Sequence, residues 1–325
     1  MGRQRTIGFM ESHAEARHVY PHRSLTRPLS GANRLRYGVA VATTPWGLAH
    51  DEARQRMHAH AVASLARGER FAFSDITAAA FHDIPLVGVD ARRVHTIPFG
   101  DNPSKTHRDV VRHKIPLRAG DVTIRDGLWV TSLDRTLFDL VRRLRFEPAL
   151  AAMCAGLHRC RIGGAERAAV DRAAEAQLRA LVATRVDAAV GSRGIHNARL
   201  VLELADGRVE SPGESRSLAR MWETRLPMPE LQLPVVTDEG VYVPDFSWPE
   251  LRMFGEFDGE VKRFDPAMAS GRTPMQVTEA QVHRRRAIEL ATGWRGMHWG
   301  WDEAADADVF WKTLVAQGWK PRWRA

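Results

Sequence analysis

Hydrophobic residues in the first two-thirds of the chain follow patterns typical of both helices and strands. Apolar and small residues recur at helical spacing from His50 to Arg67, and Ser74 is suited to cap a short helix that ends before Pro85. Runs of β-branched residues between turn residues predict a strand or small hairpin at 35–42, with Gly38 at a bend, and strands at 93–98, 110–115, 121–125 and 128–130. Amphipathic or alanine-rich segments predict helices at 133–141, 147–158, 166–184 and up to residue 204. These patterns predict an α+β module with a helical linker over residues 34–204.

The pattern changes after residue 205. Pro212 and Gly213 open a helical pattern that runs to about Thr224. Residues 240–248 and 251–258 predict two strands joined by a turn at Pro249-Glu250, and a helix at 276–292 and a strand at 293–299 follow. Residues 205–325 therefore predict a separate α/β domain.

Charge and tryptophan content change at the same place. Residues 1–204 contain 31 Lys and Arg against 20 Asp and Glu, whereas residues 205–325 contain 16 against 19. Eight of the ten tryptophans follow residue 204, so both shifts indicate a domain boundary there. The basic surplus of the front part favours an anionic partner such as DNA, although it is explained equally well as a solubility device. Residues 1–33 lack periodicity, and we expect them to be disordered or loosely structured.

Several classes of protein are not expected. Cys154 and Cys160 are the only cysteines, which excludes a disulfide framework and a four-thiolate zinc site. The chain has no apolar run of membrane-spanning length and no apolar leader, so we expect a cytoplasmic protein without a membrane partner. The fourteen histidines show no paired ligand spacing, and no phosphate-binding glycine motif is present.

Carboxylates on or near the strands predicted after residue 205 form a candidate metal site. A hairpin about Pro249 would bring Asp245 close to Gly255, one residue from Glu256, and Glu256 and Asp258 would face the same side of the sheet. Like charges at this distance repel unless a cation lies among them, and carboxylate oxygens suit Mg²⁺ or Mn²⁺. Glu214 lies in the first turn of the preceding helix, where it either joins this site or only stabilises the helix. In the alternative, Glu256 and Asp258 face water and pair with Lys262 and Arg263.

These residues resemble a known nuclease signature. Pro244-Asp245 and Glu256 look like the PD-(D/E)xK motif, and the run from Glu214 to Trp299 resembles the very-short-patch-repair-endonuclease-like group of that superfamily. The resemblance implies a restriction-endonuclease-like domain with a central mixed sheet flanked by helices. It implies that Asp245 and Glu256 hold Mg²⁺ or Mn²⁺, with the Phe257 carbonyl and Glu214 completing the shell. It also implies a DNA-binding basic helix with Arg284, Arg285 and Arg286.

One departure from the signature affects the expected activity. The lysine that should follow Glu256 by two residues is Asp258, and Lys262 is either its substitute or an ordinary surface lysine. The leading hypothesis is a metal-dependent DNA endonuclease with Asp245, Glu256, Asp258, Lys262 and Glu214 in its catalytic site. The second is a DNA-binding regulator with a non-catalytic nuclease-like domain, and the third is a module that acts on a toxin-like protein partner.

The front module resembles AbiEi-type antitoxin proteins. The resemblance lies in residues 73–86, 93–95 and 126–140. Relatives of that kind usually begin with a winged helix-turn-helix, of which only residues 35–42 look like the wing here. Four basic residues on the predicted strands either contact phosphates or form a solvated face: Arg92, Arg93, Arg112 and Lys114.

Overall fold

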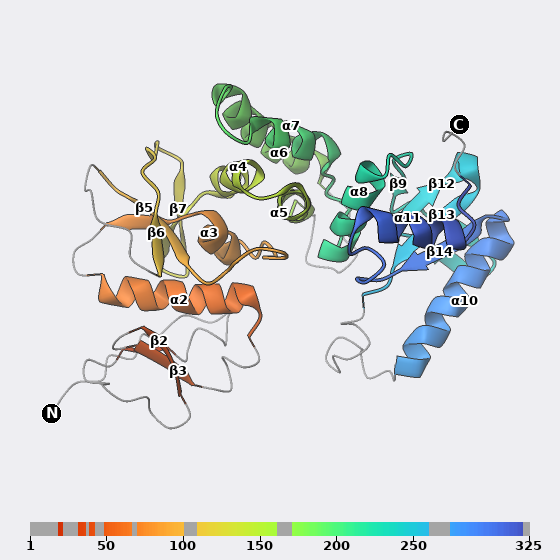
Figure 1. The fold of residues 1–325 in the computed structure, drawn as a ribbon, viewed down its shortest axis with the longest axis horizontal. Coiled ribbons are helices and arrows are strands. Elements are labelled where there is room, and N and C mark those ends of the chain that lie inside the picture. The colour runs from red at the N-terminus through yellow and green to blue at the C-terminus, as the bar shows by residue number, and fades with distance from the viewer. Residues whose placement is uncertain are drawn as a thin grey trace. The chain divides into compact units, whose positions relative to one another are not determined.

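The chain forms two compact units. The computed structural model describes residues 19–21, 32–36, 39–42, 49–66, 70–100, 109–160, 171–259 and 274–320. The first unit comprises residues 1–156 and 172–204, and the second comprises residues 157–171 and 205–325 (Figure 1). The main segment of the second unit thus begins at Ala205, where charge and tryptophan content change.

A small antiparallel sheet opens the first unit. Its strands are β1 (Val19–Pro21), β2 (Ala32–Arg36) and β3 (Val39–Ala42), in the order β1-β3-β2. The hairpin predicted at residues 35–42 is therefore confirmed for the described residues. Helix α2 (Asp51–Leu65) packs Met57 and Ala61 against Val39 and Val41. Apart from these strands, the residues of the 1–33 segment lie outside the described part of the chain.

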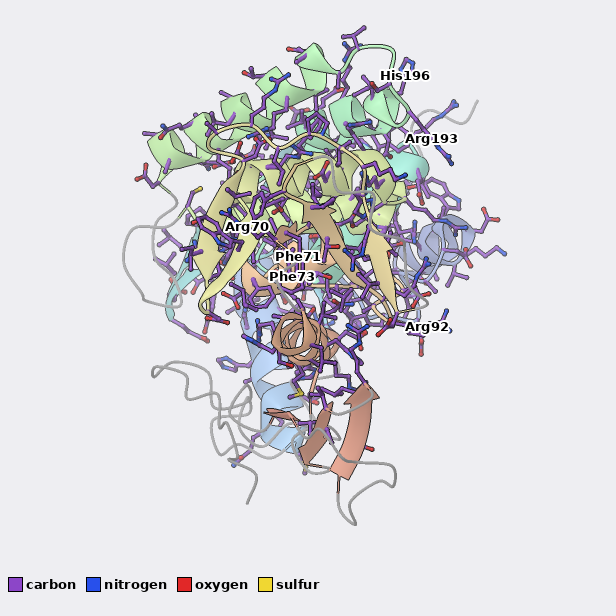
Figure 2. The ribbon with its side chains drawn as sticks, turned by 90° about the vertical axis from the view of Figure 1, so that its left-hand side faces the viewer. Arg70, Phe71, Phe73, Arg92, Arg193 and His196 are labelled. Carbon is purple, nitrogen blue, oxygen red and sulfur yellow. The ribbon has the colours of Figure 1, made fainter. Side chains whose placement is uncertain are left out.

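A five-stranded mixed sheet forms the centre of the first unit. Its order is β6-β5-β4-β8-β7, with β4–β8 and β5–β6 parallel and the other pairs antiparallel. The strands are β4 (Phe71–Phe73), β5 (Val94–Pro98), β6 (Val110–Arg112), β7 (Val122–Arg125) and β8 (Leu128–Thr131). Phe71 and Phe73 of β4 have ring centroids 5.3 Å apart (Figure 2), and Phe73 is buried against Val62 of α2 and Phe81.

Helices complete the first unit. Helix α3 (Asp75–Phe81) directly follows β4, and α4 (Leu133–Arg143) directly follows β8. Ile76 and Ile84 pack against Leu140 and Ala152 in a second core. The remaining helices are α5 (Phe146–His158), α6 (Arg172–Ala188) and α7 (Ile195–Leu204). Each predicted helix of this region is present within the described residues.

The second unit contains a four-stranded mixed sheet in the order β14-β13-β12-β9. Strands β12 (Phe246–Trp248) and β13 (Met253–Phe257) form an antiparallel hairpin through the 3-10 turn η2 (Pro249–Leu251). Strand β14 (Arg295–Trp299) pairs parallel with β13, and β9 (Glu230–Leu231) pairs antiparallel with β12. The predicted α/β character and the mixed central sheet are confirmed.

Helices cover both faces of this sheet (Figure 1). Trp299 packs edge-on against Phe310 of α11 (Ala307–Ala316) and donates to the Ser217 hydroxyl of α8 (Pro212–Glu223) at 2.7 Å. On the other face, Phe254 clusters with Ile288 of α10 (Pro274–Thr292). The sheet side chains therefore alternate between a tryptophan-rich face and the α10 face. No helix in the described part of the chain is both long and apolar enough to cross a membrane.

The prediction of one continuous strand at residues 240–248 is wrong. Strand β11 (Gly240–Tyr242) pairs with β10 (Val235–Thr237) in a separate hairpin, whereas β12 belongs to the four-stranded sheet. Pro244 lies between the two strands and has no N–H to donate to a ladder. The break leaves Asp245 at the end of β12, outside both ladders.

Gly255 on β13 allows a close approach between this strand and the Trp299 indole in the second unit's core. A Cβ atom at this position would collide with the Trp299 indole, whose Cζ3 would lie 2.6 Å away. Trp299 is fixed by its contact with Phe310 and by stacking on Phe246, so it has little room to shift.

We expect Gly255→Ala to destabilise the second unit by about 1–3 kcal/mol, because overpacking a filled core strains it. The control is Gly259→Ala, whose Cβ would find its nearest neighbour at 3.9 Å. Urea unfolding followed by tryptophan fluorescence reports mainly on this unit, which contains most of the tryptophans. Equal unfolding midpoints for the two variants would contradict the packing argument.

Candidate functional site

Asp245 is held at the end of β12 by the backbone of the neighbouring strand. Its Oδ2 accepts a hydrogen bond from Phe257 N at 2.8 Å, beside Glu256. Its carbonyl accepts from Gln232 N at 3.2 Å, and Gln232 adopts a left-handed φ of 51°. The hairpin is present, but its register Phe246↔Gly255 differs by one residue from the predicted one and places Asp245 next to Glu256 rather than Gly255. These contacts fix the direction of the Asp245 carboxylate before any ligand binds.

Glu214 both caps α8 and faces Asp245. Its backbone N donates to Ser211 Oγ at 3.2 Å, while its Oε1 accepts from the same hydroxyl at 2.7 Å and its Oε2 accepts from Glu210 N at 2.8 Å. This is a variant of the capping box, so the helix-stabilising role expected for Glu214 is confirmed. Gln232 Nε2 lies 3.5 Å from Glu214 Oε2 and 3.5 Å from Asp245 Oδ1, and it therefore links the two carboxyl groups. Burial and the negative charge of Asp245 raise the pKa of Glu214 to about 8.

Glu256 lies on the α10 face of β13. Its Oε1 is 2.6 Å from Arg284 Nη2 of α10, which also donates to the Val243 carbonyl at 2.7 Å. Burial raises the pKa of Glu256 to about 7; Arg284 opposes this shift, whereas Asp245 and Asp258 add to it. Asp258 Oδ1 accepts from Gln281 Nε2 of α10 at 2.9 Å. Glu256 and Asp258 therefore point to the same side of the sheet, as their spacing predicts.

The basic residues predicted for this site have different surroundings. Arg284 is the cation of the acidic cluster, and Arg285 Nη1 contacts His298 Nδ1 at 2.8 Å. Arg286 is exposed on α10. Lys262 and Arg263 lie outside the described residues, so the alternative in which they pair with Glu256 and Asp258 stays untested. In the first unit, Arg92 is exposed and ion-paired with Asp90 at 2.7 Å (Figure 2).

The cluster of Glu214, Asp245 and Glu256 can accept positive charge. It contains three carboxyl groups in a largely desolvated position, and the Arg284 guanidinium pairs with the Glu256 carboxylate. Carboxylate oxygens are the type of ligand that a hard divalent cation prefers. In the described part of the chain, however, the oxygens of these three residues do not all come within 4.8 Å of one another.

A second group, in the first unit, was not found from the sequence. The ligand atoms of Asp75, His95 and His113 lie within 4.8 Å of one another, so this group could hold a metal ion. The two histidines are eighteen residues apart in the chain and come together because β5 and β6 pair in parallel. A search for fixed ligand spacing therefore misses them, and only the correct pairing of predicted strands would find them. Burial lowers the pKa of His95, and burial together with Arg143 lowers that of His113 to about 4.

Comparison with known proteins finds two similar curated proteins. They are the "Uncharacterized protein MT2308" of Mycobacterium tuberculosis (strain CDC 1551 / Oshkosh) and the "Uncharacterized protein Rv2248" of Mycobacterium tuberculosis (strain ATCC 25618 / H37Rv). Each is 31% identical to this chain over 230 residues, which cover 70% of this chain and 74% of the relative. No protein-family model matches the chain, and no solved structure matches it.

The raised pKa of Glu214 predicts how stability changes with pH in chelator-treated protein. The pKa of Glu214 is about 8 in the folded chain against an ordinary value of 4.5, so folding takes up a proton between these two pH values. Stability contributed by this group is full below pH 4.5 and falls as the pH rises towards 8, with a limiting slope of about 1.4 kcal/mol per pH unit for one proton.

Glu214→Gln should flatten this dependence between pH 5.5 and 8, because the amide cannot ionise. The exposed Glu250→Gln serves as the control and should keep the slope of the wild type. The measurement is urea unfolding across this range, followed by tryptophan fluorescence. A Glu214→Gln slope identical to that of the wild type would show that Glu214 is ionised in the folded protein.

Proposed function

This chain belongs to the same family as the two mycobacterial proteins, and we propose that its second unit is a metal-dependent DNA endonuclease of the restriction-endonuclease-like kind. The observation that carries the proposal is the convergence of three carboxyl groups from three separate elements. Glu214 comes from the first turn of α8, Asp245 directly precedes β12, and Glu256 lies on β13. The order of hairpin, α10 and parallel β14 is compatible with the proposed fold.

The electrostatics of the cluster support the binding of a cation. Burial and neighbouring carboxylates raise the pKa of Glu214 to about 8 and that of Glu256 to about 7, so their charged forms are disfavoured. A divalent ion would stabilise the charged forms, and carboxylate and carbonyl oxygens are the ligands that Mg²⁺ and Mn²⁺ prefer. We propose that Asp245, Glu256 and the Phe257 carbonyl would hold this ion. Glu214 would complete the shell once the Gln232 amide moves from between the two carboxyl groups.

When bound, such an ion lowers the pKa of a water molecule and stabilises the charge that develops on a phosphodiester. The chain itself supplies orientation. The Phe257 amide holds the Asp245 carboxylate in place, and the packing of Gly255 on Trp299 fixes the strand that carries Glu256.

Arg284 is the proposed counterpart of the lysine that the signature lacks. Asp258 occupies the lysine position and is bound by Gln281, whereas the Arg284 guanidinium lies at Glu256. A guanidinium stays protonated and therefore cannot act as a base, but it can bind a phosphate oxygen in two-pronged geometry. Its proposed role is to neutralise charge on the scissile phosphate rather than to activate water.

A specific contact favours a second candidate function, a DNA-binding regulator with a non-catalytic rear domain. The Arg284–Glu256 ion pair and the Gln232 bridge satisfy much of the acidic cluster without any metal. The net positive charge of residues 1–204 would then hold DNA by its phosphates. The AbiEi-like character of the first unit and a toxin-like partner remain predictions of this second candidate.

The first test is nicking of supercoiled DNA with Mg²⁺ or Mn²⁺. We expect Asp245→Asn and Glu256→Gln each to lower the nicking rate on the order of 10²-fold, because each removes charge that holds the ion. Glu250→Gln, at the far turn of the same hairpin, should retain the wild-type rate. If no variant differs from the wild type, or the wild type binds DNA in a salt-sensitive manner but never nicks it, the second candidate replaces the first.

The second test separates Arg284 from the rest of its basic helix. Arg284→Met should lower the nicking rate by at least tenfold and Arg284→Lys by less, because lysine keeps the charge but loses the two-pronged geometry. Arg286→Met is the matched control from the exposed side of α10 and should affect only DNA affinity. Equal losses of nicking in Arg284→Met and Arg286→Met would assign Arg284 to general DNA binding.

A further inference from the structure

The first unit brings one carboxylate and two imidazoles together at one end of its sheet. Asp75 is the first residue of α3, His95 lies on β5, and His113 directly follows β6. His95 Nδ1 is 3.0 Å from His113 Nε2, and Asp75 Oδ2 is 3.8 Å from the former and 3.9 Å from the latter. One point in the plane of these three atoms therefore lies about 2.1 Å from each of them. This distance is the length of a zinc bond to nitrogen or oxygen (~2.0–2.2 Å).

The backbone around these residues is fixed before any ion binds. Ser74 N donates to the His95 carbonyl at 2.9 Å, and His113 N donates to the Thr96 carbonyl at 2.8 Å. Thr77 Oγ1 accepts from His95 N at 2.9 Å and donates to Gln55 Oε1, also at 2.9 Å. Outer contacts of this kind orient the ligands of metal sites and limit their reorganisation on binding.

Asp75 adopts a conformation that is costly for a residue with a side chain. Its φ is 53°, in the left-handed region, where a non-glycine residue stores conformational strain. Its Oδ1 accepts from Ile76 N at 2.8 Å, which leaves Oδ2 directed at the two imidazoles. This backbone conformation places one carboxylate oxygen of Asp75 in the histidine cluster. The Asp75 side chain is only 5% exposed.

Arg143 supplies the positive charge of this cluster. Its Nη1 lies 2.9 Å from Asp75 Oδ2, 2.8 Å from His113 Nδ1 and 3.1 Å from His113 Nε2. It is the last residue of α4, and its side chain is 32% exposed, whereas that of Asp75 is almost fully buried. The guanidinium can therefore leave towards solvent, while the three ligands cannot.

We infer that Asp75, His95 and His113 form a binding site for a zinc-type divalent ion, which displaces Arg143 and ties α3, β5 and β6 together. Two imidazoles and one carboxylate favour zinc, cobalt or nickel over magnesium. Three protein ligands leave at least one coordination position of the ion open to water or to another small ligand. This site is separate from the acidic cluster of the second unit and does not depend on the function proposed for it.

The test measures Zn²⁺ affinity of the full chain by calorimetry after chelator treatment, with Co²⁺ absorption as a second probe. We expect His95→Gln and His113→Gln each to weaken the tightest Zn²⁺ site at least tenfold. Arg143→Met should strengthen it about tenfold, because it removes a competing cation and no ligand. His298→Gln, a variant of an exposed histidine in the second unit, should leave the affinity unchanged.

Other outcomes overturn the inference. A folded wild type that binds no Zn²⁺, or one whose Zn²⁺ affinity is unaltered by His95→Gln and His113→Gln, removes the site. A folded Arg143→Met variant that binds Zn²⁺ no more tightly than the wild type removes the displacement of Arg143 and with it the proposal. Arg143→Met keeps the test decisive even where the histidine variants fail to fold. Thermal stabilisation by Zn²⁺ but not by Mg²⁺ distinguishes this site from the acidic cluster.

Discussion

The second unit depends on one physical conflict, the burial of carboxyl groups close to one another. Desolvation and mutual repulsion both favour the neutral form of Glu214 and Glu256, and the raised pKa values express this. The fold tolerates the conflict through fixed donors: the Ser211 hydroxyl, the Phe257 amide and the Arg284 guanidinium. A protein without a use for these charges would be more stable with apolar residues there.

The two units solve the problem of buried charge differently. In the first, Asp121 accepts from both Arg135 and Arg185 at 2.7 Å, so the buried carboxylate has two guanidinium partners. Those contacts connect α4 and α6 to Asp121, which directly precedes β7, and each Asp121 carboxylate oxygen accepts from an arginine. In the second, Asp245 accepts hydrogen bonds from the Phe257 backbone amide and from the Gln232 side-chain amide. The first arrangement is a structural ion network, whereas in the second a neutral amide links the carboxyl groups of Asp245 and Glu214.

Much of the fold could be predicted because local patterns and tertiary contacts agree. The β12–β13 hairpin follows from alternating residues around Pro249, and the common side of Glu256 and Asp258 follows from strand geometry alone. The break at Pro244 was missed because aromatic and β-branched residues on both sides of Pro244 have strand propensity, and only the pairing partners reveal two sheets. Strands β4, β9 and β10 are two or three residues long and have too little pattern to be distinguished from loops. The ligands Asp75, His95 and His113 have no common spacing, because parallel pairing across a long connection sets their proximity.

Gly255 has a consequence for how this family can change over time. The glycine and the Trp299 indole fill one face of β13, while the acidic residue next to the glycine points to the opposite face. The architecture of the strand and the chemistry at its end are therefore separable, because a lineage could exchange Glu256 and keep an intact sheet. A lineage that exchanged the glycine would instead weaken the packing of the sheet. Relatives that keep the fold but have lost the acidic site can therefore arise, and the presence of the glycine alone would not show that a relative is active.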